Sequence, residues 1–324
     1  MKIKEPLDRG RIHLKSRIVF PPMATQTAEG GMPTAGTAAH YEAIARNPLS
    51  GLMITEYASI SRQGMAADAR QLSFASDRVL EAQKRFTDHI HRVNGSIQLF
   101  AQINHAGANT SERATGEELV SASPIQMGGG LARALTIPEI RTIEDLFARA
   151  ALRVKEAGYD GVEIHAAHGY LLNQFYSPLT NFRKDIYGPQ SIENRTRMLK
   201  ETLEAVRQAV GDDFPIALRL GGSDYREGGS TIEDAVEASV ILEKAGLDLI
   251  DLSGGMNIYM RRDNRNPGWF SDMSEAVKRE VSIPVLVTGG IRTPAQAETL
   301  LQQGKADLIG VGRAMFIHPM WGAE

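Results

Sequence analysis

Short apolar segments alternate with longer amphipathic segments along almost the whole chain. The short segments are rich in Val, Ile and Leu and end at Gly or polar residues, which predicts β-strands. The longer segments repeat apolar positions every three or four residues, which predicts helices. Eight strands are predicted within residues 17–24, 51–60, 96–107, 159–164, 215–224, 247–255, 283–291 and 306–315. Helices are predicted within 37–46, 77–94, 142–158, 193–211, 231–246, 270–281 and 293–305.

The repeated strand–helix unit predicts the fold class. Helices are expected to begin at Thr142, Thr231 and Thr293, whose hydroxyls can cap helix amides, and to end at a glycine. Such units predict parallel strands joined by right-handed crossovers. Eight of them predict an α/β fold, a closed (β/α)8 TIM barrel formed as a single domain by residues 1–324. The alternative is an open doubly wound sheet, which normally has a glycine fingerprint where this chain has PPMATQ.

Two insertions interrupt the alternation. The segment near 108–140 contains the run MGGG and is too long for a plain connection, and segments of this kind are usually lids or disordered. The segment near 254–268 is polar and contains Arg261, Arg262 and Arg265, which either contact a nucleotide phosphate or are simply solvated. Because both insertions follow strands, both are expected on the active face of the barrel.

Composition narrows the functional classes. A hydrophobic share of 42% and a charged share of 23% are typical of a soluble protein with a large core. A net charge of -3 with scattered basic residues gives no footprint for nucleic acid or a membrane surface. The chain has no cysteine, which excludes disulfides and cysteine-ligated metals and agrees with a cytoplasmic location; no metal site is expected. No signal peptide or long apolar run is present.

The C-terminal part of the sequence is short. Only AMFIHPMWGAE follows Arg313, which predicts a short or missing final helix. The flank left open would be covered by further chain or by a partner subunit, so a homo-oligomer is one expectation.

Candidate catalytic residues lie at the end of the fourth predicted strand, in the sequence VEIHAAHGY. His165 and His168 are three residues apart and Tyr170 follows two residues later, so their donors can converge on one ligand atom. A single buried histidine would more often be a core residue. The combination instead predicts a catalytic site at the carboxyl end of the strand.

Glycines follow the last two predicted strands. TGGI spans residues 288–291 and VGRA spans 311–314, the places where barrel enzymes commonly bind phosphate through backbone amides. Gly290 and Gly312 allow close approach of a phosphate, and Arg313 can add charged hydrogen bonds. Glycines that merely end strands are the alternative interpretation.

The other strand ends complete the mouth of the predicted barrel. They contribute Pro22, Met23, Ala24, Tyr57, Gln102 and Arg219. Gln102 and Arg219 suit the polar edge of a planar heterocycle. Arg219 in an apolar strand is costly without an anionic or electron-rich partner. The alternative is a buried salt bridge with Glu163 or Asp224.

These segments together resemble the old yellow enzyme family of FMN-dependent ene-reductases, especially its bacterial single-domain branch. The matching stretches are RIVFPPM, AQINHAG, IHAAHGYLLNQFYSPLTNFRKDIYGPQSIENR, LR in the fifth strand, TGG and GR. The central stretch is highly specific. The resemblance implies bound FMN, NADPH or NADH as reductant, and ping-pong reduction of the activated C=C bond of a small α,β-unsaturated carbonyl compound.

The resemblance also implies roles for single residues. His165 and His168 would hold the substrate carbonyl oxygen, and Tyr170 would protonate the α-carbon. The flavin would contact Pro22, Met23, Ala24, Tyr57, Gln102, Arg219, Gly290, Gly312 and Arg313. Ala24 stands where cysteine or threonine is common and removes a contact that tunes the flavin potential, and Tyr57 stands where a small residue is common.

Three alternatives to an ene-reductase remain open from the sequence. The first is an amine or alcohol dehydrogenase of the same family, and the second is a non-catalytic barrel that binds FMN. The third, a phosphosugar aldolase or isomerase, is weaker because no predicted strand end carries a lysine for a Schiff base.

Overall fold

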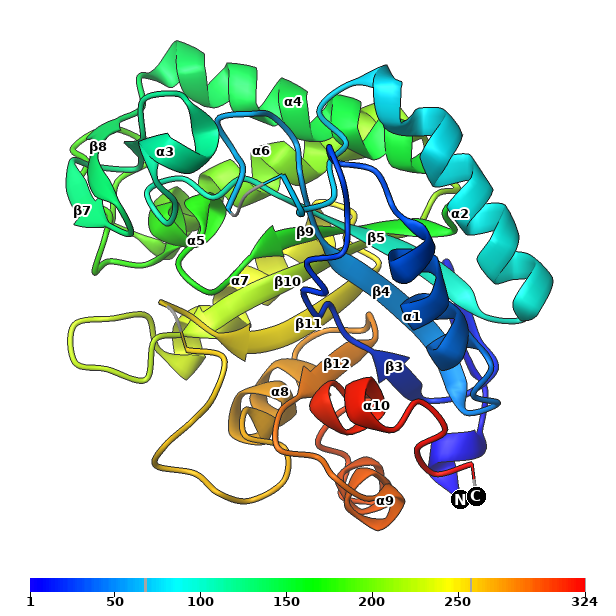
Figure 1. Cartoon of the computed structure of the whole chain (residues 1–324). Helices are drawn as coiled ribbons and strands as arrows, with labels where there is room; N and C mark the ends of the chain where they lie inside the picture. The colour runs from blue at the N-terminus through cyan, green and yellow to red at the C-terminus, as the bar shows by residue number, and fades with distance from the viewer. Residues whose placement is uncertain (67–68, 257, 324) are drawn as a thin grey trace.

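A computed structural model describes residues 1–66, 69–256 and 258–323. Its centre is a closed barrel of eight parallel strands (Figure 1). These are β3 (Ile18–Phe20), β4 (Ser50–Ser59), β5 (Gln98–Asn104), β9 (Gly161–Ala166), β10 (Ile216–Ser223), β11 (Leu249–Gly254), β12 (Val285–Thr288) and β13 (Leu308–Gly310). Each strand pairs with the next in this order, and β13 pairs with β3. The predicted TIM barrel is confirmed.

A helix follows each barrel strand on the outside of the barrel. These are α1 (Ala35–Ala45), α2 (Leu80–Val93), α4 (Ile137–Glu156), α6 (Ile192–Val210), α7 (Ile232–Lys244), α8 (Ser271–Lys278), α9 (Pro294–Gln302) and α10 (Arg313–Ile317). Two shorter helices are η2 (Asp77–Val79), before α2, and α5 (Leu171–Tyr176), after β9. Helix α10 has 5 residues, which confirms the expectation of a short final helix.

The predicted helix starts are confirmed at Thr231 and Thr293 and are wrong at Thr142. Thr231 and Thr293 are N-caps with reciprocal capping boxes. Helix α4 begins one and a half turns earlier, after Thr136, whose hydroxyl accepts from the Glu139 amide while the Glu139 carboxylate accepts from the Thr136 amide. Thr142 lies inside the helix, and its hydroxyl donates to the carbonyl of Pro138 at 3.1 Å.

The N-terminal segment closes the bottom of the barrel. After the 3-10 helix η1 (Lys2–Lys4), strands β1 (Leu7–Arg9) and β2 (Ile12–Leu14) form an antiparallel hairpin. Three hairpin side chains pack against the apolar interior side chains of the barrel. This inner cluster consists of Leu7, Ile12, Leu14, Val19, Leu52, Ile54, Phe100, Ala217, Leu249, Leu286 and Leu308. A larger core lies between the strands and the outer helices.

The inward positions become polar towards the carboxyl end of the strands. Because side chains alternate along a strand, the residue two positions after an inward apolar residue also points inward. Gln102 follows Phe100, Arg219 follows Ala217 and Asp251 follows Leu249 in this way. All three side chains are buried, so the barrel interior changes from a dry base to a charged upper layer.

The insertion near 108–140 is ordered. It contains the short helix α3 (Glu112–Thr115) and a small sheet of β6 (Val120–Ser121), β7 (Ile125–Met127) and β8 (Gly130–Ala134), in the order β6-β8-β7. Gly128 turns the β7–β8 hairpin with φ 50°, and a Cβ at Gly129 would lie 2.4 Å from the Ser111 Cβ. The glycines therefore permit close packing, and the segment, which its length predicted to be a lid or disordered, contains a helix and a small sheet.

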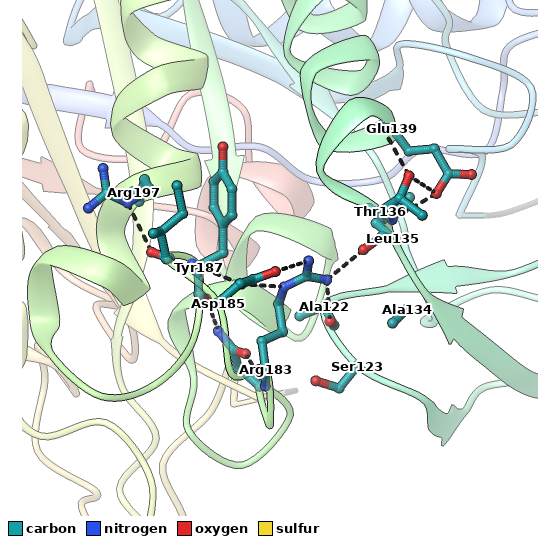
Figure 2. A network of polar contacts seen from close by, with 12 residues as sticks. Ala122, Ser123, Ala134, Leu135, Thr136, Glu139, Arg183, Asp185, Tyr187 and Arg197 are labelled. Atoms are coloured by element: carbon teal, nitrogen blue, oxygen red, sulfur yellow. Dashed lines mark hydrogen bonds and ion pairs between the residues drawn. The ribbon is translucent and has the colours of Figure 1, made fainter.

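Arg183 fastens this insertion to the segment after α5 (Figure 2). Its guanidinium donates to the carbonyls of Ala122 at 3.0 Å and Leu135 at 2.6 Å, and it forms an ion pair with Asp185 at 2.6 Å. The Phe182 amide adds a hydrogen bond to the Ser123 hydroxyl. Side-chain exposure of Arg183 is 8%, so these bonds lie away from water.

The C-terminal segment covers the flank beside the short final helix. The Trp321 indole donates to the carbonyl of Arg292 at 2.7 Å, and the Asn47 amide donates to the carbonyls of Pro319 and Trp321. Both ends of the chain lie on the same side of the barrel (Figure 1). Across the described ranges, no helix has the length and apolarity needed to span a membrane.

The Arg183 network generates a stability prediction. Arg183→Ala removes the guanidinium donor from two buried carbonyls and the ion-pair partner from Asp185, so we expect the free energy of unfolding to fall by about 3 kcal/mol. Urea unfolding followed by circular dichroism measures the change. Lys184→Ala is the matched control, since Lys184 is exposed and we expect a change within about 0.5 kcal/mol. Equal losses in the two variants would contradict the role given to Arg183.

Candidate active site

One cavity of about 740 Å³ opens at the carboxyl ends of the barrel strands. Its wall includes every residue that the sequence analysis named as catalytic or as a flavin contact, but not Arg261, Arg262 or Arg265. The included residues are Pro22, Met23, Ala24, Tyr57, Gln102, His165, His168, Tyr170, Arg219, Gly290, Gly312 and Arg313. They come from all parts of the chain and meet because a parallel barrel brings its strand ends to one face.

His165 is the most firmly oriented of the candidate catalytic residues. It lies within β9, is 2% exposed, and its Nδ1 faces the Gln102 side-chain nitrogen at 3.4 Å. The same nitrogen donates to the Glu163 carboxylate at 2.8 Å. An amide N–H facing Nδ1 favours the tautomer that carries its proton on Nε2. The His165 ring therefore has a donor to offer on its other side.

His168 has a strained backbone. Its φ is 60°, in the left-handed region that residues with a side chain rarely adopt. Nε2 is 2.8 Å from the Ser253 hydroxyl, the Asn109 side chain donates to the His168 carbonyl, and the next amide, of Gly169, donates to Asn173. Strain held by several surrounding contacts is typical of functional sites. The contacts bring the two histidine rings to a centroid distance of 5.1 Å.

Tyr170 lies at the start of α5 and faces both His165 and Tyr57. Its ring centroid is 5.2 Å from that of His165 and 5.7 Å from that of Tyr57. Burial and a hydrogen bond with the Tyr57 hydroxyl raise the pKa of Tyr170 far above that of an ordinary tyrosine. Tyr170 therefore keeps its proton throughout the neutral range. Tyr57, predicted as a cofactor contact, lies against Tyr170 and also lines the cavity.

Both histidines are neutral at physiological pH. Desolvation lowers the pKa of His165 well below its ordinary value of 6.5, with smaller effects from His168 and Arg219. Desolvation, followed by the charge of Arg219, lowers the pKa of His168 in the same direction. Because burial disfavours the charged form, each ring acts as a neutral hydrogen-bonding group.

Arg219 forms a buried salt bridge, as one interpretation of the sequence expected, but its partner is Asp251. The expected partners, Glu163 and Asp224, were wrong. Arg219 Nε lies 3.1 Å from Asp251 Oδ2, directly across from it on β11. Asp224 instead accepts hydrogen bonds from Ser177 and Ser230. Burial raises the pKa of Glu163 and of Asp251, and the charge of Arg219 opposes both shifts.

The charged layer below the cavity is incompletely hydrogen-bonded. One Glu163 oxygen, both Asp251 oxygens and the Arg219 Nε have no hydrogen-bond partner of good geometry among the described residues. Buried groups of this kind normally find partners. The cavity wall at Arg219 therefore suits a ligand with several hydrogen-bonding edges.

A glycine cradle forms the other end of the cavity. Gly289 and Gly290 have φ of 130° and 67°, and a Cβ at Gly290 would lie 2.5 Å from the Trp269 indole nitrogen. A Cβ at Gly312 would lie 3.2 Å from the Met23 sulfur. The Arg313 guanidinium lies 5.0 Å from the centroid of the Trp269 ring. Bare backbone beside a guanidinium is suited to a phosphate group.

Several residues of the site were missed in the sequence, among them Ser253, Asp251 and Trp269. Ser253 and Asp251 belong to the strand LDLIDLSGG, where the polar positions at every second residue could have indicated an inward face. Trp269 follows Gly268 at the end of the second insertion, and its aromatic character before a helix was the available indication.

Within the described residues, no group of three or more acidic, histidine or cysteine side chains could hold a metal ion.

Comparisons with known sequences identify relatives over the whole barrel. A sequence model of the NADH:flavin oxidoreductase / NADH oxidase family matches residues 2–323. The NADPH dehydrogenase of Clostridium acetobutylicum is 35% identical over 321 residues, covering 98% of this chain and 93% of that protein. The NADH oxidase of Thermoanaerobacter brockii is 37% identical over 320 residues, covering 96% of this chain.

Some relatives are longer than this chain. The chain spans about half of the Thermoanaerobacter brockii enzyme, 48%, and 47% of a metal reductase from Desulforamulus reducens. The family is named for its flavin and its nicotinamide reductant, which agrees with FMN as cofactor and NADH or NADPH as electron source.

Solved structures give the same result. An old yellow enzyme homologue from Zymomonas mobilis has a TM-score of 0.82 at 26% identity, covering 97% of this chain and 89% of that chain. A 2-naphthoyl-CoA reductase in complex with 2-naphthoyl-CoA has a TM-score of 0.90 at 25% identity, covering 98% of this chain and 51% of that chain. The chain therefore belongs to the NADH:flavin oxidoreductase / NADH oxidase family, the family of the old yellow enzymes.

Proposed function

We propose that this chain is an FMN-dependent ene-reductase, which uses NADPH or NADH to reduce the activated C=C bond of α,β-unsaturated carbonyl compounds. We further propose that residues 1–324 act as one FMN-binding domain on small-molecule substrates. The observation that carries the proposal is the convergence of two neutral histidines and one protonated tyrosine on the wall of a single cavity.

The histidines bind the substrate carbonyl oxygen in this proposal. His165 has its Nδ1 turned to the Gln102 amide, which leaves the Nε2 proton for a carbonyl acceptor. The Ser253 hydroxyl holds His168 Nε2, and when that hydroxyl donates, His168 carries its proton on Nδ1. Neutral donors already fixed before the reaction stabilise the negative charge that grows on the oxygen as hydride adds.

Tyr170 is the proton donor to the α-carbon in this proposal. A raised pKa keeps its hydroxyl protonated, and its ring lies beside His165, where the carbonyl would be held. General acids of this kind contribute about 10²- to 10⁴-fold in rate. Tyr57 orients the Tyr170 hydroxyl through their hydrogen bond.

The cavity residues fit FMN. Gln102 and Arg219 would hold the polar edge of the ring, Pro22, Met23 and Ala24 its flank, and Gly290, Gly312 and Arg313 the phosphate. The Arg219 Nε, which has an ion pair with Asp251 but no hydrogen bond of good geometry among the described residues, and the glycine cradle support this assignment. Bound FMN supplies hydride chemistry, from the nicotinamide to the β-carbon of the substrate. One cavity would serve both reactants in turn, which corresponds to ping-pong kinetics.

Tyr170→Phe tests the proposal. We expect flavin reduction by NADPH to stay within about twofold of wild type, because no substrate carbon is protonated in that half-reaction. Reoxidation of the reduced flavin by an enone should slow by about 10²- to 10⁴-fold, because the proton donor is removed. Stopped-flow absorbance follows each half-reaction separately. Equal slowing of both half-reactions would remove Tyr170 from the role of proton donor.

The pKa shifts predict a flat pH profile for the half-reaction with an enone. The lowered pKa of both histidines keeps them neutral, and the raised pKa of Tyr170 keeps it protonated. We therefore expect a constant rate from about pH 6 to about pH 9, where ordinary histidine and tyrosine would begin to titrate at the two ends. A loss of rate below pH 7 that disappears in His168→Asn would show that His168 does titrate and would contradict the assignment.

Gly290→Ala tests the cofactor site. The new Cβ meets the Trp269 indole and narrows the cradle at a residue of positive φ, so we expect FMN to bind at least about tenfold more weakly. Titration of the flavin-free protein by FMN fluorescence measures this. Gly304→Ala is the control, because Gly304 has φ 72° and nothing within 4 Å of its added Cβ. That variant should lose about 1 kcal/mol of stability and keep its affinity for FMN.

A further inference from the structure

A second groove adjoins the cavity at its phosphate end. It has a volume of about 480 Å³ and shares Trp269, Gly290 and Arg292 with the wall of the main cavity. The groove is built by two segments, the insertion before α8, which provides Arg261 and Arg265, and the start of α9, which provides Arg292. A ligand lying in the groove can therefore continue into the cavity past these three shared residues.

The groove wall is strongly positive. It contains three arginines and, among the described residues, no aspartate or glutamate. Arg261 is anchored by ion pairs with Asp263 and Asp272. Arg265 and Arg292 are exposed and form no ion pair with any described residue. Two guanidinium groups are thus free to bind an anion.

Helix α9 adds to the positive electrostatic potential of the groove. Gln296, the third residue of this helix, lines the groove, and the partial positive charge of a helix N-terminus favours anions. The Gln296 side chain lines the groove and accepts from the amides of Arg292 and Thr293 at 2.8 and 3.2 Å. Since these amides are already bonded, the helix supplies potential, and the arginine side chains supply the hydrogen bonds.

The insertion connects the groove with the candidate catalytic residues. Tyr259, near its beginning, lies 6.2 Å from the His168 ring centroid, and Trp269, at its end, forms part of the groove. One side of this insertion therefore runs from the substrate end of the cavity to the arginines. An extended ligand can lie along it, with its reactive group at the histidines and an anionic group at Arg265 and Arg292.

We propose that the groove binds the ribose phosphate of an adenine nucleotide whose reactive end enters the cavity. Two ligands carry this chemistry, NADPH with its adenosine 2′-phosphate and a coenzyme A thioester with its adenosine 3′-phosphate. The inference rests on the proposed function for the reactive end of the ligand. It goes beyond that function by assigning Arg265 and Arg292 to a phosphate other than that of FMN.

The experiment is calorimetric titration of the FMN-loaded, oxidised protein with three probes. They are adenosine 2′,5′-bisphosphate, adenosine 3′,5′-bisphosphate and adenosine 5′-monophosphate, which lacks a ribose phosphate. We expect at least one bisphosphate to bind about tenfold more tightly than the monophosphate, the gain typical of one charged hydrogen-bonded group. Preference for the 2′-phosphate identifies NADPH as the ligand, and preference for the 3′-phosphate identifies a coenzyme A thioester.

The double variant R265A/R292A should abolish the preference for the bisphosphate. R262A is the matched control, since Arg262 is exposed on the same insertion but does not line the groove. It should retain the preference, which separates the groove from a general effect of net charge. Equal affinity of wild type for all three probes, or the same loss in R262A as in the double variant, would overturn the proposal.

The titration does not depend on turnover. If the protein binds the bisphosphate through these arginines but does not reduce enones, the proposed groove stands and the proposed function is wrong. If the protein reduces enones but binds all three probes equally, the proposed function stands and the proposed nucleotide site in the groove is wrong.

Discussion

The burial of Arg219 inside the barrel is the constraint on which the cavity depends. A guanidinium in that position needs a counter-charge, and Asp251 lies 3.1 Å away on the neighbouring strand. Glu163 is the second acid of the layer, and it holds the Gln102 amide, which faces Nδ1 of His165. The orientation of the His165 imidazole therefore depends on the polar side chains beneath it. Glu163, which does not line the cavity, can in this way determine which nitrogen of His165 carries the proton.

The location of the site could be predicted from the sequence, but its internal partners could not. The alternating strand and helix segments predict a parallel barrel, and any parallel barrel gathers its strand ends, so Gln102, His165 and Arg219 had to share one cavity. Which acid pairs with Arg219 depends on the register between β10 and β11, where Arg219 stands opposite Asp251. A single sequence contains the strands but not their register, and for this reason Glu163 and Asp224 were equally reasonable candidates.

The sequence misplaced the start of helix α4 and did not reveal how the segment near 108–140 packs. Thr136 and Thr142 both precede sequences typical of a helix start. The first position is used because its capping box is supported by an ion pair of Glu139 with Arg133 at 2.6 Å, six residues earlier in β8. The segment around the run MGGG was expected to be a lid or disordered because of its length. In the folded chain its glycines allow the hairpin to pack against residues 110–111, a purpose that only the tertiary structure reveals.

The pairing of β3 with β13 has a consequence for how the molecule is assembled. The amide of Ile309 donates to the carbonyl of Arg17, so residues almost 300 positions apart complete the ring. The entropy of closing so long a loop has to be offset by contacts that exist only when the ring is complete. During synthesis on the ribosome, the first strand therefore waits with an unpaired edge until the last strand has emerged. An unpaired edge can pair with another chain, so crowding and chaperone supply should influence the yield of this protein more than its final stability suggests.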